Sequence, residues 1–445
     1  MKIAAVPGRP LSGAVSLPGD KSISHRAALF AALAGGESQI DNFLVAGVTK
    51  VMLEALSELG INWSLRGTRL EVKGIGMQGN KLVDPVMLNC GNSGTTMRLL
   101  AGAIATLGIS AVLDGSPGLR SRPMKRIVDP LRAMGVSIEA SPQNGAPLRI
   151  GARSPGRKLK PLDYDLPIAS AQVKTCLLLA ALGANGQTVL REPGPSRDHT
   201  ERMLQAMKVD LTRSSGETDP EHFEVRLSPP ESRELEPLLI DIPGDFSSAA
   251  FLIVAALITP GSRIRIQGVG LNPTRTGLLD ALQSMGAGIM ISNRRDSQGE
   301  PVGDLEIKYQ PLLGTQISGS LLVRMIDEIP VFAVAAAHAR GRSIVSQAGE
   351  LRHKESDRIS DLCQELRRLG VKVEEKSDGF IIEGGRHVHG GIIDPHGDHR
   401  LGMALVVAGL AAQETVIVQN SEIIDESFPE FREVLVSLGG EVHIG

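Results

Sequence analysis

The feature that most constrains the fold is a sixfold repeat of one pattern, a polar turn followed directly by an apolar, Ala- and Leu-rich helix. The copies are residues 17–36, 89–108, 166–186, 242–261, 325–341 and 394–413. Their spacing of roughly 70–80 residues is longer than the common solenoid repeats. A helix that is apolar around most of its circumference must be buried on all sides. The chain is therefore predicted to enclose six buried helices.

A second, amphipathic helix is predicted between successive copies. These segments are 49–63, 122–139, 199–211, 272–290, 355–375 and 428–444. Each has apolar residues at helical spacing with charges between them, and then a glycine and a strand-like segment. In the third segment Lys208 stands in place of the glycine. One face of each such helix meets solvent, so the simplest arrangement is a mixed α/β protein with three buried helices in each of two domains.

The length of 445 residues also indicates two domains, because a single core stops growing at about 250–300 residues. The similar segments LPGD (17–20) and IPGD (242–245) open the two halves. We expect one domain to comprise residues 1–20 and 243–445 and the other residues 21–242, with the chain crossing at both segments. The polar turns should gather at one end of each domain. If these ends face each other, they form an anion-binding cleft lined by helix N-termini.

Composition excludes several classes of function. The net charge is −3 and aromatic residues make up 3%, which argues against a nucleic acid or an anionic membrane as the main partner. Cys90, Cys176 and Cys363 lie far apart and have no metal-ligand spacing, so we expect buried thiols and no metal. The N-terminus has no apolar signal core, and no apolar run approaches the length of a membrane span. We expect a cytoplasmic protein.

The polar turns contain many cations and few carboxylates. Arginine and lysine beside hydroxyl groups at a helix start suit a ligand with more than one anionic group. On the residues alone, an alternative stays open: Ser-capped helices with solvated charges, including Asp327 beside Glu328 and the segment KESDR (354–358). His25 and His399 are interpreted as structural residues, and Arg98 receives no role.

The motifs LPGDKSISHRA, GNSGTTMR, RPM, SAQVK, HKESDR and GDHR, in this order over nearly the whole chain, resemble the signatures of the 5-enolpyruvylshikimate-3-phosphate (EPSP) synthase family. The resemblance implies a two-domain inside-out α/β barrel with three βαβαββ-type repeats per domain and an active site in the interdomain cleft. It implies transfer of the enolpyruvyl group of phosphoenolpyruvate to the 5-hydroxyl of shikimate 3-phosphate, with release of phosphate. No metal or organic cofactor is implied, and we expect a monomer.

The same resemblance assigns roles to individual residues. The shikimate 3-phosphate site would comprise Lys21, Ser22, Arg26, Ser170, Ala171, Gln172, Ser196, Asp327 and Lys354. Phosphoenolpyruvate would be bound by Lys21, Gly94, Thr95, Arg122, Gln172, Arg358 and Arg400. Asp327 would take the proton of the 5-hydroxyl and Glu355 would protonate the methylene carbon, with Lys21 as a third proton carrier.

Two positions depart from the pattern of many family members. Leu99 follows Arg98 where many members have proline, and Glu426 stands where many have a lysine that contacts phosphoenolpyruvate. These departures leave the response to glyphosate open. Two alternatives remain: a UDP-N-acetylglucosamine enolpyruvyl transferase, disfavoured because the loop Ser116–Arg122 lacks that enzyme's reactive cysteine, and a non-catalytic anion-binding protein.

Overall fold

The computed structural model describes residues 1–77, 85–215, 222–232, 234–385 and 387–445, and these form two compact units. Unit 1 contains Met1–Asp20, Pro243–Asp296 and Pro301–Gly445. Unit 2 contains Lys21–Ile242 and Ser297–Glu300. The short second segment of unit 2 is the tip of a hairpin whose strands continue in unit 1, which the sequence analysis did not include.

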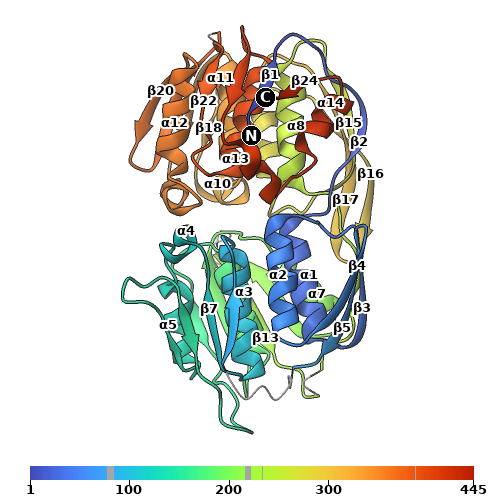
Figure 1. The fold of residues 1–445 in the computed structure, drawn as a ribbon, viewed down its shortest axis with the longest axis vertical. Helices are drawn as coiled ribbons and strands as arrows, with labels where there is room; N and C mark the ends of the chain where they lie inside the picture. Colours follow the sequence, from blue (N-terminus) through green and yellow to red (C-terminus); the bar gives the residue numbers. More distant parts are fainter. Residues whose placement is uncertain (78–84, 216–221, 233, 386) are drawn as a thin grey trace. The chain divides into compact units, whose positions relative to one another are not determined.

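The described residues of unit 2 form three four-stranded sheets with the same pairing, one parallel pair followed by two antiparallel pairs. Figure 1 labels β3, β4 and β5 of one sheet and β7 and β13 of the other two. The first is β14 (Leu239–Asp241), β3 (Gly35–Asp41), β5 (Arg69–Ile75) and β4 (Asn62–Arg66). The second is β6 (Val86–Asn89), β7 (Ala111–Asp114), β9 (Leu148–Ile150) and β8 (Ile138–Glu139). The third is β10 (Asp163–Asp165), β11 (Thr188–Pro193), β13 (His222–Ser228) and β12 (Asp210–Ser215).

Unit 1 has three further four-stranded sheets among its described residues. They are β22 (Gly391–Ile393), β23 (Val416–Val418), β1 (Ile3–Val6) and β24 (Glu441–Ile444); β16 (Ile289–Ser297), β17 (Glu300–Lys308), β15 (Arg263–Gly270) and β2 (Ser12–Ser16); and β18 (Gln316–Ile317), β19 (Gly341–Val345), β21 (Gly379–Gly384) and β20 (Lys372–Lys376). The three repeats expected in each half are therefore present as three sheets of one kind per unit.

Each unit buries three helices, as the apolar repeats predict. They are α1 (Lys21–Leu33), α3 (Gly94–Leu107) and α6 (Ala171–Ala181) in unit 2, and α8 (Phe246–Ile258), α11 (Ile329–His338) and α13 (His399–Leu410) in unit 1. In unit 1 these three helices pack against one another. In unit 2, α3 and α6 approach closely because Gly102 has no side chain; a Cβ there would lie 2.3 Å from the Cys176 carbonyl oxygen.

The amphipathic helices are α2 (Gly47–Glu58), α5 (Lys125–Ala133), α7 (His199–Ala206), α9 (Gly277–Ser284), α12 (Arg358–Arg368) and α14 (Phe431–Ser437). Short helical segments are α4 (Pro117–Arg120), α10 (Gly319–Arg324), η1 (Gly349–His353) and η2 (Ser421–Glu426). Lys208, which follows α7, has a φ of +64°, in the left-handed range of the glycines that follow the other five helices, such as Gly60 at +75°. The left-handed backbone conformation is thus present after all six helices, although the third has a lysine in place of the glycine.

Two helix starts differ from the sequence interpretation. Lys21 and Ser22 were expected in a turn, but α1 begins at Lys21, immediately after the segment LPGD. The alternative interpretation of the segment KESDR as a charged first helical turn is not what the structure shows, because α12 begins only at Arg358. Asp357 is its N-cap and accepts a hydrogen bond from the Ser360 amide at 3.1 Å, which leaves Glu355 outside the helix.

In unit 1 the two PGD segments lie side by side. The Asp20 amide donates to the Pro243 carbonyl and the Asp245 amide to the Pro18 carbonyl, each at 2.9 Å. The buried guanidinium of Arg275 contacts the carboxylates of Asp20 at 3.4 Å and Asp245 at 3.1 Å. The chain segments that cross between the units at residues 20–21 and 242–243 are therefore both fixed to one arginine.

Candidate functional site

Arg26 ties the starts of three helices of unit 2 together. Its side chain is buried, and its Nη1 donates to the Ser22 carbonyl at 2.9 Å. Nε and Nη2 donate to the hydroxyls of Thr200 and Thr175 at 2.8 and 2.9 Å, and Nη2 also reaches the Ala171 carbonyl at 3.4 Å. These neutral partners satisfy donors that burial would otherwise leave unpaired. The first turns of α1, α6 and α7 consequently lie together.

The first turn of α1 carries Lys21 and Ser22 beside Arg197. Arg197 Nη1 donates to the Ser22 hydroxyl at 3.0 Å. The Lys21 carbonyl accepts a hydrogen bond from His25 Nδ1 at 2.8 Å. Burial lowers the pKa of His25 to about 4, so its imidazole is neutral at pH 7. This environment agrees with the structural role expected for His25.

The starts of α3 and α6 are joined by side chains. Gln172 Nε2 donates to the Thr95 hydroxyl at 2.8 Å, and the Gln172 carbonyl oxygen accepts from Arg98 Nη1. A Cβ atom on Gly94 would lie 3.0 Å from Arg98 Nη1 and 3.1 Å from Arg122 Nη1. The space that glycine leaves open is therefore bordered by two guanidinium groups, a setting that favours an anion.

In unit 1 Arg358 is surrounded by carboxylates. Its Nε lies 2.6 Å from Asp398 Oδ2 and its Nη2 lies 2.6 Å from Glu355 Oε2. Nη1 reaches Asp327 Oδ1 at 3.3 Å. Burial by itself would lower the pKa of this guanidinium, but the charges of Asp398, Glu355 and Asp327 raise it above its ordinary value, so Arg358 remains charged.

Arg400 lies at the start of α13 and completes this cluster. Its Nη2 is 3.6 Å from Asp327 Oδ2, and its Nη1 is 3.3 Å from the Asp327 carbonyl and 3.8 Å from Glu328 Oε1. Glu328 in turn accepts a hydrogen bond from the Ser247 hydroxyl of α8. The starts of α8, α11 and α13 therefore lie together. The predicted residues form one connected cluster, in which Asp327 contacts both Arg358 and Arg400, and Glu355 contacts Arg358.

The remaining predicted residues occupy the same segments. Ser170 is the N-cap of α6, and its hydroxyl accepts a hydrogen bond from the Val173 amide at 3.5 Å. Ser196 lies in the loop before α7 and is buried. Lys354 directly precedes Glu355 and is half-buried.

Several residues of these clusters were missed by the sequence analysis. They are the partners that hold the arginines, namely Thr175, Thr200 and Asp398, together with Arg98 beside Gly94. For Asp398 a signal was available, because an aspartate directly before an apolar helix is a strong N-cap; its carboxylate accepts from the Arg400 amide at 2.8 Å. Nothing local in the sequence marks Thr175 or Thr200.

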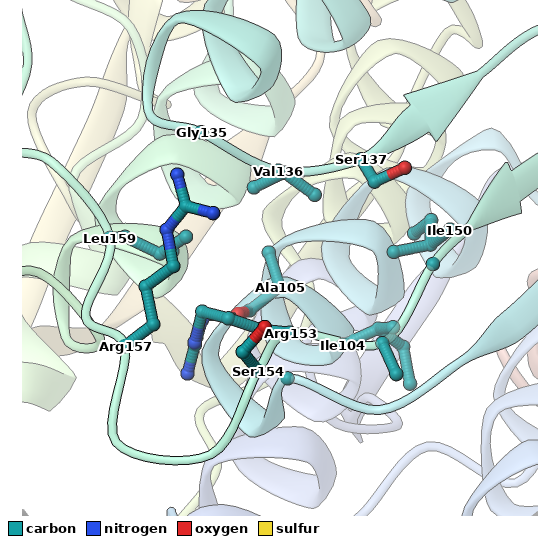
Figure 2. Close-up of a pocket in the computed structure, with 13 residues that line it drawn as sticks. Ile104, Ala105, Gly135, Val136, Ser137, Ile150, Arg153, Ser154, Arg157 and Leu159 are labelled. Carbon is teal, nitrogen blue, oxygen red and sulfur yellow. The ribbon is translucent and has the colours of Figure 1, made fainter.

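A cavity of about 100 Å³ in unit 2 lies at the other end of α3 (Figure 2). It is lined by Ile104 and Ala105 of α3 and by Arg153 and Arg157. Arg153 donates to the carbonyls of Ala105 and Thr106 at 2.5 and 2.9 Å, so it satisfies the C-terminal end of that helix. None of the predicted site residues lines this cavity.

Comparison with known proteins agrees with the motifs. The family model for EPSP synthase (3-phosphoshikimate 1-carboxyvinyltransferase) matches residues 6–435. A 3-phosphoshikimate 1-carboxyvinyltransferase of Desulforamulus reducens is 46% identical over 440 residues, which is 98% of this chain and 99% of the relative. One from Xylella fastidiosa is 47% identical over 97% of this chain and 92% of its own length. The chain belongs to the EPSP synthase family.

Solved structures show the same relationship. The EPSP synthase of Acinetobacter baumannii superposes with a TM-score of 0.86 at 36% identity, covering 100% of this chain and 99% of that one. The enolpyruvyl transferase NikO of Streptomyces tendae shares only 19% identity but has a TM-score of 0.76 over 99% of this chain and 98% of that one, so the fold extends beyond close relatives. The two-domain inside-out α/β architecture of the EPSP synthase family is thus the architecture of this chain.

The three cysteines are free and buried, as expected. Burial raises the pKa values of Cys90, Cys176 and Cys363 to about 12, so each remains a neutral thiol at pH 7. Among the described residues, no group of three His, Cys, Asp or Glu side chains is placed to hold a metal ion. None of the described helices is long and apolar enough to cross a membrane.

Proposed function

We propose that this chain transfers the enolpyruvyl group of phosphoenolpyruvate to the 5-hydroxyl of shikimate 3-phosphate and releases phosphate. The observation that carries the proposal is the cluster in unit 1 in which ion pairs link Glu355 to Arg358, Arg358 to Asp327 and Asp327 to Arg400. Proton-transferring carboxylates beside anion-binding guanidiniums are what an addition to an enol phosphate, followed by elimination of phosphate, requires. Membership of the EPSP synthase family supports the same reaction.

Phosphoenolpyruvate carries a phosphate and a carboxylate, and both must be neutralised before the double bond accepts a proton. Arg122, Arg358, Arg400 and Lys21 supply the positive charge in this proposal. Gly94 and Thr95 leave room for the pyruvyl group, because a Cβ at Gly94 would meet the guanidiniums of Arg98 and Arg122.

Shikimate 3-phosphate is bound, in the same proposal, by groups at the starts of the buried helices. Lys21, Ser22, Arg26, Ser170, the Ala171 backbone, Gln172 and Ser196 hold its phosphate and neighbouring hydroxyls. Arg26 is oriented by four neutral oxygen atoms, which fix the guanidinium without cancelling its charge. Asp327 and Lys354 bind the hydroxyls of the ring.

The proton transfers are divided between two carboxylates. Asp327 accepts the proton of the 5-hydroxyl as its oxygen attacks, and Glu355 delivers a proton to the methylene carbon, giving a tetrahedral ketal. Elimination of phosphate requires the opposite proton transfers: Glu355 removes a proton from the methyl carbon, and Asp327 gives up the proton that it accepted. Each carboxylate therefore acts once as acid and once as base. Lys21 is the third group able to carry a proton. The two arginines beside Asp327 stabilise its carboxylate form, which is the form that accepts the proton of the 5-hydroxyl and is restored after the elimination.

The proposal is tested by phosphate release. Mixing the protein with shikimate 3-phosphate and phosphoenolpyruvate should release phosphate, whereas UDP-N-acetylglucosamine in place of shikimate 3-phosphate should not. Release only with the nucleotide sugar would assign the chain to the sister activity. Release with neither acceptor would contradict catalysis and favour a protein that only binds anions. We propose further that the protein acts as a cytoplasmic monomer, which sedimentation of the purified chain tests.

A further inference from the structure

A buried cluster of charged residues lies directly behind the proposed phosphate site of unit 2. Lys174 Nζ, on the second turn of α6, is 2.7 Å from Glu192 Oε1 and 2.7 Å from Glu201 Oε1. Glu192 lies on β11 and Glu201 in the first turn of α7, and all three side chains are at most 2% exposed. Neither the sequence analysis nor the proposed reaction assigns these groups a role.

The cluster has one positive and up to two negative charges. When both carboxylates are ionised, its net charge is −1 in a site without access to water, which is costly. The charges of Glu192 and Glu201 raise the pKa of Lys174 against the effect of burial, so the ammonium group stays charged. Burial and the neighbouring Glu201 raise the pKa of Glu192, although Lys174 opposes them. One added proton would make the cluster neutral.

Ser196 connects this cluster to the proposed substrate site. Its hydroxyl donates a hydrogen bond to Glu192 Oε2 at 2.5 Å, and its carbonyl lies 3.5 Å from Lys174 Nζ. A hydroxyl has one proton, so Ser196 cannot donate to an ionised Glu192 and to a phosphate oxygen at the same time. A phosphate dianion only accepts hydrogen bonds. To bind the Ser196 hydroxyl it must receive the hydroxyl proton, which in the structure is donated to Glu192.

We propose that Glu192 takes up a proton when the phosphate of shikimate 3-phosphate binds, so that the Ser196 hydroxyl turns from Glu192 to the phosphate. The proton comes from solvent and resides on Glu192 Oε2, which then donates to Ser196 Oγ. The Ser196 proton is donated to a phosphate oxygen, and no covalent bond to carbon or phosphorus changes. Lys174 and Glu201 remain an ion pair, and the cluster becomes neutral beside the incoming dianion.

The groups that face Glu192 are consistent with this exchange. Lys174 approaches from α6, Glu201 from α7 and Ser196 from the loop between β11 and α7. Phe223 on β13 is paired with Glu192 across the sheet. Lys174 is also one residue from Thr175, which holds Arg26, so the cluster and the proposed phosphate ligands share one helix turn. Glu192 is in this view a positioning residue, since it acts on the substrate only through Ser196.

Calorimetric titration with shikimate 3-phosphate at pH 8, in two buffers of different ionisation enthalpy, tests this inference. At that pH the phosphate is already a dianion, because its second pKa is about 6. The parent protein should take up between about half a proton and one proton on binding, as neutralisation of the cluster requires. A binding enthalpy that does not depend on the buffer would overturn the inference.

Two matched variants separate positioning from packing. Glu192→Gln should abolish proton uptake, because its amide oxygen can face Lys174 while its NH₂ donates to Ser196 and frees the hydroxyl. Glu201→Gln also removes one negative charge, but it leaves Glu192 ionised and the Ser196 hydroxyl engaged. We therefore expect Glu201→Gln to lose about tenfold more affinity than Glu192→Gln, the value of one hydrogen bond to a charged group.

A purely structural cluster would respond differently, because both substitutions would then weaken binding equally. Equal affinities, or uptake that persists in Glu192→Gln, would contradict the inference. If Glu192→Gln does not fold, the parent protein and Glu201→Gln still test the inference. Proton uptake on binding should be present in the parent protein and reduced in Glu201→Gln.

The inference rests on the proposed function, but different results would reject the inference and the proposed reaction. Phosphate release by the parent protein without proton uptake on binding would reject the inference alone. Proton uptake on binding of shikimate 3-phosphate without any turnover would reject the proposed reaction alone.

Discussion

Arg26 of unit 2 and Arg358 of unit 1 are both buried, but they are held by different kinds of partner. Within unit 2, Arg26 is oriented by the hydroxyls of Thr175 and Thr200 and by two backbone carbonyls. Within unit 1, Arg358 is oriented by the carboxylates of Asp327, Glu355 and Asp398. Neutral partners fix a guanidinium and preserve its charge for an anion, whereas carboxylates fix it and also supply groups that exchange protons. We propose on this basis that unit 2 supplies most of the groups that bind shikimate 3-phosphate, whereas unit 1 supplies the two proton-transferring carboxylates and two of the arginines that bind phosphoenolpyruvate.

The largest effect is expected for Arg358→Met. Removing the guanidinium leaves Asp398, which is fully buried, and two neighbouring carboxylates without their common cation. The free energy of unfolding should fall by about 3–5 kcal/mol, and turnover should be lost with it. Urea unfolding monitored by circular dichroism measures the first effect. A loss below that of Arg26→Met would contradict the distinction between the two units.

Acid should destabilise unit 2 through His25. The folded protein binds a proton at His25 only near pH 4, whereas the unfolded chain binds it near 6.5, so the unfolded state holds more protons between these values. Stability should therefore fall as the pH drops from 6.5 to 4, by about 3 kcal/mol for this group. Urea unfolding at several pH values shows the slope. The variant His25→Asn should have a shallower slope, and an unchanged slope would refute the assignment.

Glu355→Gln tests the proton-transfer role of unit 1. The amide keeps the size of the side chain and an acceptor for Arg358, but it cannot deliver a proton. We expect kcat to fall by about 100-fold or more, the usual contribution of a general acid, with little change in the affinity for shikimate 3-phosphate. Steady-state kinetics and calorimetry separate the two quantities. Weak binding with normal turnover of the bound substrate would reverse the assignment.

Arg26→Met tests the anion-binding role of unit 2. The four oxygen atoms named above are neutral, and the hydroxyls of Thr175 and Thr200 lie 2.6 Å apart and can bond to each other, so stability should fall by only about 1–2 kcal/mol. The KM for shikimate 3-phosphate should rise by about tenfold or more, because a charge-assisted contact is lost. The KM for phosphoenolpyruvate should change less. Equal increases in both KM values would argue against a role specific to one substrate.

Lys208→Gly should have the smallest effect and serves as a control in unit 2. A lysine with a φ of +64° is strained, and glycine relieves this at some cost in unfolded-state entropy. The net gain in stability should be about 0.5 kcal/mol, with kcat and both KM values unchanged. A rise in melting temperature without kinetic change would show that stability and substrate affinity vary independently in this unit.

Much of the fold follows from hydrophobic patterning. The six apolar helices and their amphipathic partners were predicted from the sequence, and α1, α3, α6, α8, α11 and α13 are buried as expected. Lys208 could be recognised as the counterpart of a glycine because the surrounding pattern repeats. Helix starts were less accurate, since capping by Asp357 competes with the charged segment before it.

The charged residues of the candidate site could be named from their motifs, but their partners could not. The sequence by itself determined which segments are buried, because helical periodicity is encoded within a single stretch of about 15 residues. Only the tertiary structure decided that Arg26 meets Thr200, that Arg358 meets Asp398 and that Lys174 lies between Glu192 and Glu201. The physical reason is that a buried charge must be satisfied by whichever groups the packing of other elements brings to it, and those elements lie far away in the chain.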